Sequence, residues 1–233
     1  MEKEKFDVII AGGGPSGSAC AITLANSGLN VALIDKAVFP RDKTCGDALG
    51  IDVINQLSYM SSALAEKFKA LQNKIPSYGI KVFSADHSSI SIPLLYNNQK
   101  ACGYVVPRME FDNFLFQFAK EQSNIHCFEN TIIEKVETNK DVVIVSTKNK
   151  IFLAPIIIGA DGAHSVVTKQ LSDIHVDKNH YCAGLRIYYE GLTGFENDNL
   201  IELHFFKEIA PVIYGYSLWQ IIKRMLALAC FHQ

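Results

Sequence analysis

The sequence has no excess of charge of either sign. Lysine and arginine total 22 against 24 aspartates and glutamates, so the formal net charge of the 233 residues is −2 at pH 7. A chain with this balance has no long-range field that would concentrate nucleic acid or anionic lipid at its surface. We therefore expect no nucleic-acid partner.

Long apolar runs are absent as well. No stretch of about 18 consecutive apolar residues occurs, so hydropathy excludes a membrane-spanning helix, although peripheral association with a membrane surface stays open. The hydrophobic content of 48% is nevertheless enough for a sizeable core. Length and composition together indicate a globular protein with one large domain or two modest ones.

The six cysteines lack the paired spacing of a metal site. They are scattered along the chain without a CxxC pair, which argues against structural zinc, so we expect no metal ligands. The opening residues MEKEKFDVII also lack the pattern of a signal peptide. We therefore expect free thiols, a reducing compartment and a cytoplasmic location.

What the sequence does contain is a glycine cluster near its start, in DVIIAGGGPSGSACAITLANSGLNVALIDK. Residues 6–11 are typical of a buried parallel strand and residues 18–27 of a helix. At the turn between them, Gly12 allows the tight bend and Gly14 lets the backbone approach a pyrophosphate. Gly17 lets the helix pack closely on the strand, and the N-terminal amides of the helix then face the phosphates.

An acidic residue follows the second strand. The segment NVALIDK ends near Asp35, roughly 20 residues beyond the glycine turn, where a carboxylate accepts hydrogen bonds from ribose hydroxyl groups. A GxGxxG pattern alone is a weak signal. The strand before it, the helix after it and the acid at this distance favour dinucleotide binding over a glycine-rich structural turn.

A second turn of the same kind lies further along the chain. In IIIGADGAHSVV an apolar strand runs into a Gly-Ala-Asp-Gly turn, which places Asp161 at the carboxyl edge of a sheet. The alternative is a turn that uses Asp and Gly only for their backbone tolerance. Together with the first motif, the cofactor-binding interpretation is favoured.

These motifs resemble the flavoprotein fold of p-hydroxybenzoate hydroxylase, whose members bind FAD. Within that fold, FPRDKTCGDALG is similar to a segment of the geranylgeranyl reductase family. Arg108 in YVVPRMEFDNFL resembles the arginine that opens the long helix of the FAD domain. GLRIYYEGL and IELHFFKEIAP resemble the substrate-domain strands of the family. The resemblance covers residues 6 to about 211.

The resemblance implies an α/β fold. We expect a Rossmann-like, three-layer FAD-binding domain with a mostly parallel sheet, interleaved with an incomplete antiparallel-sheet substrate domain. Residues 1–75 and 106–172 would form the discontinuous FAD-binding domain, and residues 76–105 and 173–233 the substrate domain. The expected cofactor-binding residues are Gly12, Gly14, Pro15, Ser16, Gly17, Asp35, Lys36, Cys45, Gly46, Asp47, Arg108, Asp161 and Gly162.

Cys45 is the candidate catalytic residue. Arg41 and Lys43 lie near it in a polar loop, a setting that favours the thiolate. In the family that it resembles, a cysteine at the matching place lies by the flavin and is implicated in reduction of an isoprenoid double bond. The alternative is a plain buried thiol. Ala48 departs from the family, which commonly has glycine there.

The resemblance implies an FAD-dependent reductase that saturates isoprenoid C=C bonds by hydride transfer from reduced flavin. The substrate would be a prenylated lipid or a quinone-type molecule, with NAD(P)H as an electron donor compatible with the family. The nearest alternative is an FAD-dependent aromatic monooxygenase, because half-buried antiparallel strands also suit an aromatic ring. No pattern predicts the oligomeric state.

The tail from about residue 212 departs from the family pattern. The fold normally adds a third segment with a Gly-Asp turn, and Gly46-Asp47 is the one such pair in the sequence. A back-translation shifted by one base restores the expected pattern, so we expect an out-of-frame tail and a truncated chain. Two alternatives stay open: LWQIIKRMLALACF is a real helix, or the chain is an inactive fragment with a partial FAD site.

Overall fold

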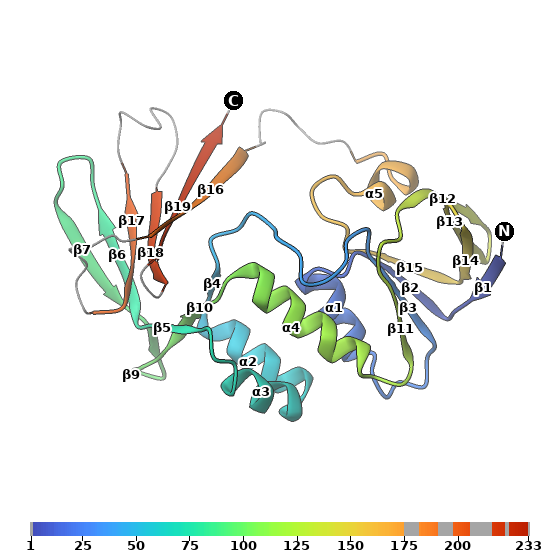
Figure 1. Ribbon diagram of the computed structural model, residues 1–233, viewed down its shortest axis with the longest axis horizontal. Coiled ribbons are helices and arrows are strands. Elements are labelled where there is room, and N and C mark those ends of the chain that lie inside the picture. The colour runs from blue at the N-terminus through green and yellow to red at the C-terminus, as the bar shows by residue number, and fades with distance from the viewer. Residues whose placement is uncertain (1, 175–181, 191–197, 206–215, 222–223, 233) are drawn as a thin grey trace. The chain divides into compact units, whose positions relative to one another are not determined.

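The computed structural model describes residues 2–174, 182–190, 198–205, 216–221 and 224–232 (Figure 1). The chain divides into two compact units, each built from two segments. The first unit is Met1–Asp42 with Met109–His175, and the second is Lys43–Arg108 with Val176–Gln233. The first segment of the first unit therefore ends at residue 42, whereas the first segment of the expected FAD-binding domain ended at residue 75. The assignment of the segments to cofactor and substrate binding stays a prediction.

The centre of the first unit is a parallel sheet with the strand order β11-β3-β2-β15. All residues of β2 and β3 are buried, which agrees with the continuous apolar runs in the sequence. The expectation of a parallel sheet is confirmed. The strands are β2 (Val8–Ala11), β3 (Val31–Ile34), β11 (Ile125–Phe128) and β15 (Ile156–Gly159).

A second sheet of the first unit packs on one face of the parallel sheet. Its order is β1-β14-β13-β12, and Ile9 and Ile34 share one core cluster with Val145 and Phe152 of that sheet. Helices occupy the opposite face, so the unit has the expected three layers (Figure 1). The elements are β1 (Glu2–Lys5), β12 (Ile133–Asn139), β13 (Val142–Thr147), β14 (Lys150–Ala154), α1 (Pro15–Thr23), α4 (Arg108–Lys120) and α5 (Val166–Leu171).

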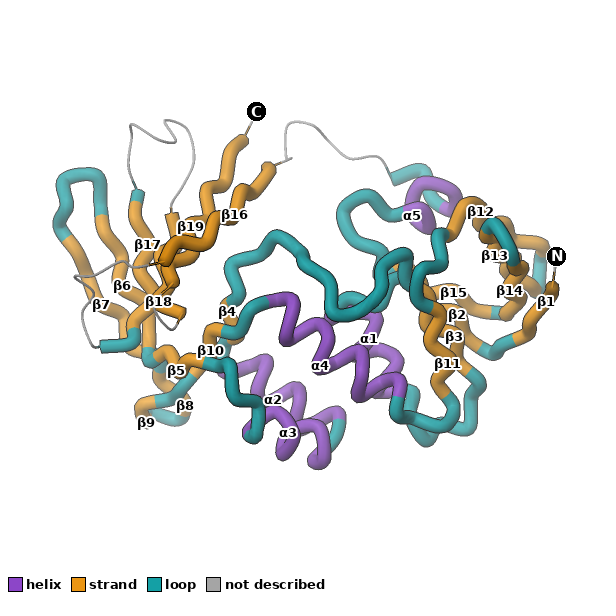
Figure 2. The backbone as a smooth tube through the Cα atoms, in the orientation of Figure 1, coloured by secondary structure: helices purple, strands orange, loops and turns teal. Residues whose placement is uncertain are grey.

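The described residues of the second unit form two helices, a three-stranded sheet with the order β4-β10-β5 and a six-stranded sheet with the order β16-β19-β18-β17-β6-β7 (Figure 2). A short hairpin, β8-β9, completes it. The bounds are β4 (Ala48–Leu49), α2 (Ile51–Met60), α3 (Ser62–Lys69), β5 (Ile75–Ser77), β6 (Gly79–Phe83), β7 (Ser89–Pro93), β8 (Leu95–Tyr96), β9 (Gln99–Lys100), β10 (Gly103–Val105), β16 (Cys182–Glu190), β17 (Leu200–His204), β18 (Tyr216–Ile221) and β19 (Arg224–His232).

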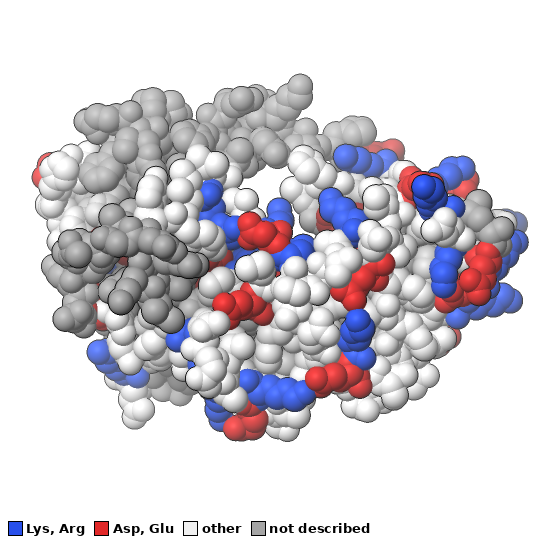
Figure 3. All heavy atoms as spheres, viewed as in Figure 1, with Lys and Arg blue, Asp and Glu red and all other residues white. Residues whose placement is uncertain are grey.

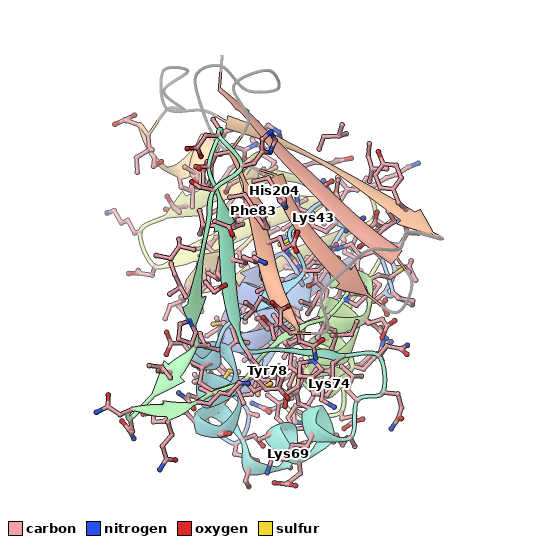
Figure 4. The ribbon with its side chains drawn as sticks, turned by 90° about the vertical axis from the view of Figure 1, so that its left-hand side faces the viewer. Lys43, Lys69, Lys74, Tyr78, Phe83 and His204 are labelled. Carbon is pink, nitrogen blue, oxygen red and sulfur yellow. The ribbon has the colours of Figure 1, made fainter. Side chains whose placement is uncertain are left out.

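The six-stranded sheet is mixed rather than wholly antiparallel. β17 pairs with β6 in parallel, while the other four pairs are antiparallel. The long part of the chain between β6 and β17 provides the crossover connection that a parallel pair requires. At the end of this pair the ring of His204 stacks on the ring of Phe83 with centroids 4.3 Å apart (Figure 4).

The tail forms strands and not the helix that its composition allows. β18 pairs with β17, and β19 pairs with both β18 and β16, all antiparallel. Helix propensity is a weak local preference, and ladder pairing along three strands overrides it. The helix alternative is therefore wrong. The start of the tail, residues 212–215, lies outside the described residues, and the expected frame change stays a prediction about the gene.

Candidate functional site

The glycine turn of the first unit joins β2 to α1 and is closed tightly on itself. Gly12 has a φ of +101°, and a Cβ atom there would lie 2.4 Å from the carbonyl oxygen of Ala160. A Cβ atom on Gly17 would lie 1.8 Å from the carbonyl oxygen of Gly12. Neither position accepts a side chain without a shift of backbone. Gly12 thus lies at a tight bend and Gly17 at a close approach of the helix to the turn.

The first turn of α1 leaves main-chain donors uncapped. Gly14 is the N-cap in extended conformation and Pro15 occupies the first helical turn. Glycine offers no side-chain oxygen, so the amides of Ser16 and Gly17 have no cap from that residue. Ser18 instead donates its hydroxyl to the carbonyl oxygen of Gly13 at 2.9 Å, which holds the turn. Such a helix start favours an anion.

Asp35 lies against this turn. The side chain is buried, and its Oδ2 atom accepts a hydrogen bond from the amide of Gly13 at 2.7 Å. The Oδ1 atom accepts from the amide of Ala37 at 2.8 Å. The structure therefore brings the acid after the second strand and the glycine turn together. Lys36, the next expected residue, is exposed.

Arg41, which the glycine motif did not indicate as a site residue, lies beside this turn. Its Nη2 atom lies 3.3 Å from the position of a Cβ atom on Gly14, so the guanidinium borders the turn. Its Nη1 atom lies 2.9 Å from Oδ2 of Asp112, whose side chain is fully buried. The guanidinium also lies 5.0 Å from the ring centroid of Phe39, which stacks on Phe116. The ion pair with Asp112 and the contact with the Phe39 ring thus hold the cation at the turn.

One sequence signal could have indicated this pair. Asp112 is an acid among the apolar residues of α4 and lies beside Phe111, which is buried. A buried carboxylate requires a partner, and a cation elsewhere in the chain is the usual one. The sequence gives no indication that Arg41 is that cation.

The second turn lies beside the first. The amide of Ala160 donates to the carbonyl oxygen of Ala11 at 2.7 Å, and Gly162 has a φ of +82°. Ser165 is the N-cap of α5, and Asp161 adds to the capping because its Oδ2 atom accepts from the amides of Val166 at 2.6 Å and of Val167 at 3.4 Å. Its Oδ1 atom is buried and has no hydrogen-bond partner among the described residues. The cofactor-binding role of Asp161 stays a prediction.

The remaining expected residues lie in the second unit. Cys45 is half-buried, whereas Asp47 is fully buried and has a φ of +57°. Oδ2 of Asp47 accepts from the hydroxyl of Tyr188 at 2.7 Å, and Oδ1 accepts from the amide of Arg108 at 3.2 Å. The guanidinium of Arg186 lies 3.8 Å from Oδ1. Tyr188 and Arg186 were not selected from the sequence.

The environment of Asp47 changes its acidity. Burial raises the pKa of this carboxyl group above its ordinary value, because desolvation disfavours the charged form. The hydrogen bonds from Tyr188 and the amide of Arg108, together with the charge of Arg186, oppose that increase in pKa. Ala48, where the family commonly has glycine, begins β4 and pairs with Val105. The left-handed conformation falls on Asp47 and does not require glycine at the next residue.

The first-unit residues fit a dinucleotide. The fit depends on three observations: a turn that excludes side chains at Gly12 and Gly17, an uncapped helix start at Gly14, and the guanidinium of Arg41 beside it. Main-chain donors and a cation suit a pyrophosphate, and Asp35 has lone pairs left for ribose hydroxyl groups.

The face shown in Figure 3 carries acidic and basic side chains in alternation over its described part. Among the described residues, no group of three histidine, cysteine or acidic side chains could hold a metal ion. No helix in the described part of the chain has the length and apolarity needed to cross a membrane.

Three curated relatives have low identity to this chain. Conditioned medium factor receptor 1 of Dictyostelium discoideum is 28% identical over 84% of this chain and 40% of its own length. Menaquinone reductase of Mycolicibacterium smegmatis is 29% identical over 79% of this chain and 44% of its own length. Geranylgeranyl diphosphate reductase of Rhodobacter capsulatus is 26% identical over 72% of this chain and 40% of its own length. The chain thus spans less than half of each relative.

Solved structures share the fold. The flavin-dependent halogenase CmlS superposes with a TM-score of 0.82 at 21% identity, covering 97% of this chain and 42% of its own. A variant of the halogenase PltM in complex with FAD superposes with a TM-score of 0.80 at 18% identity, covering 98% of this chain and 52% of its own. At these identities the likeness concerns the fold alone.

A protein-family sequence pattern also matches the chain. The sequence pattern of the family described as FAD binding domain matches residues 5–186, which include the glycine turn, Asp35, Arg41 and the turn at Asp161. This match covers more than half of the chain, and the chain therefore belongs to the FAD binding domain family.

Proposed function

We propose that the chain belongs to an FAD-dependent reductase that saturates isoprenoid C=C bonds. The observation that carries the proposal is the CGD loop, in which Cys45 is half-buried and Asp47 is anchored by three neighbours. The low-identity relatives named menaquinone reductase and geranylgeranyl diphosphate reductase support the same class of reaction.

The first unit supplies the residues that would hold FAD. The amides at the start of α1 would donate to the pyrophosphate, and the guanidinium of Arg41 would balance its charge. Each carboxylate oxygen of Asp35 already accepts one main-chain hydrogen bond, which fixes the orientation of the side chain. Each oxygen can accept a further hydrogen bond, and the proposed donors are the ribose hydroxyl groups. The Asp112 carboxylate positions Arg41.

The second unit supplies the residues for the substrate. When bound, reduced FAD supplies the hydride for the reaction. Cys45 would contact the double bond and orient it. The sheet of this unit has an apolar face: Ile80 pairs with Ile92, Val82 with Ile90, and Leu203 with Val82. Such a face suits the chain of a prenylated lipid or a quinone-type substrate. NAD(P)H is the proposed electron donor.

The reaction class is tested with the full chain under anaerobic conditions. The chain is loaded with FAD, reduced chemically and incubated with a polyprenyl lipid, and the product is analysed by mass spectrometry. The proposal expects a product with a hydrogen pair added per double bond. A hydroxylated product that forms only with oxygen would instead support the monooxygenase alternative. Failure to retain FAD would support an inactive fragment.

A further inference from the structure

The loop that carries Cys45 is tied to strand β16 by two side chains. Nη1 of Arg186 donates to the carbonyl oxygen of Lys43 at 3.0 Å, just before Cys45 in the loop (Lys43 is labelled in Figure 4). The hydroxyl of Tyr188 donates to Oδ2 of Asp47 at 2.7 Å, just after Cys45. Both ends of the short segment around Cys45 are therefore held by the same strand.

The two side chains on β16 also hold each other. Arg186 and Tyr188 are two residues apart in a strand, so they lie on the same face. The guanidinium of Arg186 lies 4.6 Å from the ring centroid of Tyr188, within the range of a cation–π contact. The Arg186 side chain is only 6% exposed. The pair is thus a preassembled surface for the loop and not two independent contacts.

Asp47 also holds the backbone of residues 106–108, which belong to the same unit. Its Oδ1 atom accepts from the amide of Arg108 at 3.2 Å, and its carbonyl oxygen accepts from the amide of Val106 at 2.9 Å. The side chain is fully buried and both carboxylate oxygens accept a hydrogen bond. A carboxylate in this state is suited to holding the backbone in place and leaves no exposed oxygen for a ligand.

We propose that Tyr188 and Arg186 are positioning residues that act through Asp47 to fix the Cys45 thiol. The left-handed conformation of Asp47 has a cost for a residue other than glycine, and the contacts of its side chain offset that cost. Removing one contact allows the loop to open and exposes the thiol. The importance of this thiol rests on the proposed function, whereas the positioning itself does not.

The chain contains a matched control. Tyr189 is next to Tyr188 in β16, so its side chain lies on the opposite face, and it is 42% exposed. Tyr188→Phe and Tyr189→Phe make the same chemical change, the loss of one hydroxyl group. Only the first removes the donor to Asp47.

The experiment measures alkylation of the full chain by iodoacetamide, with each cysteine quantified by peptide mass spectrometry. Cys127, in β11 of the first unit, is the internal reference. We expect Tyr188→Phe to raise the alkylation rate of Cys45 about fivefold, the factor that corresponds to one net hydrogen bond. The rate at Cys127 should not change. Tyr189→Phe should leave both rates within about 1.5-fold of the wild type.

Two results would overturn the proposal: an unchanged Cys45 rate in Tyr188→Phe, or an equal rise at Cys45 and Cys127, which would indicate general loosening of the fold. If Tyr188→Phe does not fold, Arg186→Lys provides the second variant. It keeps the charge but loses the planar fork. We expect Arg186→Lys to raise the alkylation rate at Cys45 and to leave the rate at Cys127 unchanged. A variant whose two alkylation rates change by the same factor, or not at all, would also overturn the proposal. No flavin or substrate is added and the readout is access to the thiol, so the result does not depend on whether the chain reduces double bonds.

Discussion

Arg41 and Asp112 form an ion pair beside the glycine turn, with Nη1 and Oδ2 2.9 Å apart. The two residues are far apart in sequence and come from a loop and from α4. Asp112 is fully buried and Arg41 is 19% exposed, so the carboxylate fixes the guanidinium while one edge of the cation can still reach a ligand. The positive charge at the α1 start is therefore supplied by a residue outside the glycine motif.

Replacement of Arg41 by methionine should weaken FAD binding. A hydrogen bond to a charged group contributes ~1.5–3 kcal/mol, so we expect at least about a tenfold rise in the dissociation constant. Lys148→Met is the matched control, because Lys148 is an exposed cation of the same unit and lies between β13 and β14. Calorimetric titration with FAD measures both. Equal affinities of the two variants would contradict the assignment of Arg41.

Removal of Asp112, the ion-pair partner of Arg41, should lower the free energy of unfolding. Asp112→Ala leaves the partly buried Arg41 without its carboxylate, and breaking a buried pair costs about 3–5 kcal/mol. The exposure of Arg41 places the expected loss at the lower end of this range. Urea unfolding of Asp112→Ala and of the exposed-acid control Asp141→Ala compares the two. A loss of less than about 0.5 kcal/mol at Asp112 would show that the pair does not stabilise the fold.

Alanine at Gly17 should not be tolerated. Its Cβ atom would lie 1.8 Å from the carbonyl oxygen of Gly12, and the main chain must shift. We expect a loss of about 1–3 kcal/mol in the free energy of unfolding, the range for overpacked sites, together with weaker FAD binding. Gly50→Ala is the control, because nothing lies within 4 Å of its Cβ position and its φ is −70°. We expect a cost under about 1 kcal/mol there.

Asp47 should make stability depend on pH. Burial raises its pKa in the folded state above the ordinary value of 3.8, so the folded chain holds the proton more tightly than the unfolded chain. Its contribution to stability is therefore greatest below pH 3.8 and is lost as the pH rises through the raised pKa. Asp47→Asn should remove this dependence. Urea unfolding at a series of acidic pH values measures the free energy of unfolding of the wild type and of Asp47→Asn. The same dependence of this free energy on pH in both chains would contradict the prediction.

Replacement of Cys45 by serine tests the proposed reductase function, because we expect the proposed reduction to slow while FAD stays bound. A hydroxyl is smaller and less polarizable than a thiol and would orient the double bond less well, so we expect a loss of about a hundredfold in rate. Cys102→Ser is the control, since Cys102 lies in the second unit outside the CGD loop. The rate is followed by product mass spectrometry. A normal rate in Cys45→Ser would exclude the catalytic assignment.

Much of the first unit could be predicted from sequence, because its signals are local. The apolar runs predicted β2 and β3, and the spacing predicted Asp35 at the end of β3 as an acceptor for ribose hydroxyl groups. Its hydrogen bond from the amide of Gly13 was not predicted. Arg41 could not be predicted, because its ion pair joins residues distant in sequence and many acids could have been its partner.

The second unit was harder to predict for the same reason. The role of Tyr188 depends on a hydrogen bond from β16 to a loop formed much earlier in the chain. The strands at the tail depend on pairing with β16 and β17, which overrides the helix propensity of that segment. The Gly-Ala-Asp-Gly pattern located Asp161 at its turn. It did not predict that the Asp161 carboxylate accepts a hydrogen bond from the first amide of α5.

The central claim is that the first unit holds FAD through the glycine turn, and the visible absorbance spectrum of the purified 233-residue chain tests it most directly. The account predicts a flavin spectrum in a one-to-one ratio with the chain, either as purified or after incubation with FAD and removal of the excess. It also predicts loss of that spectrum in Arg41→Met. A folded chain that retains no flavin after incubation with FAD would contradict the account.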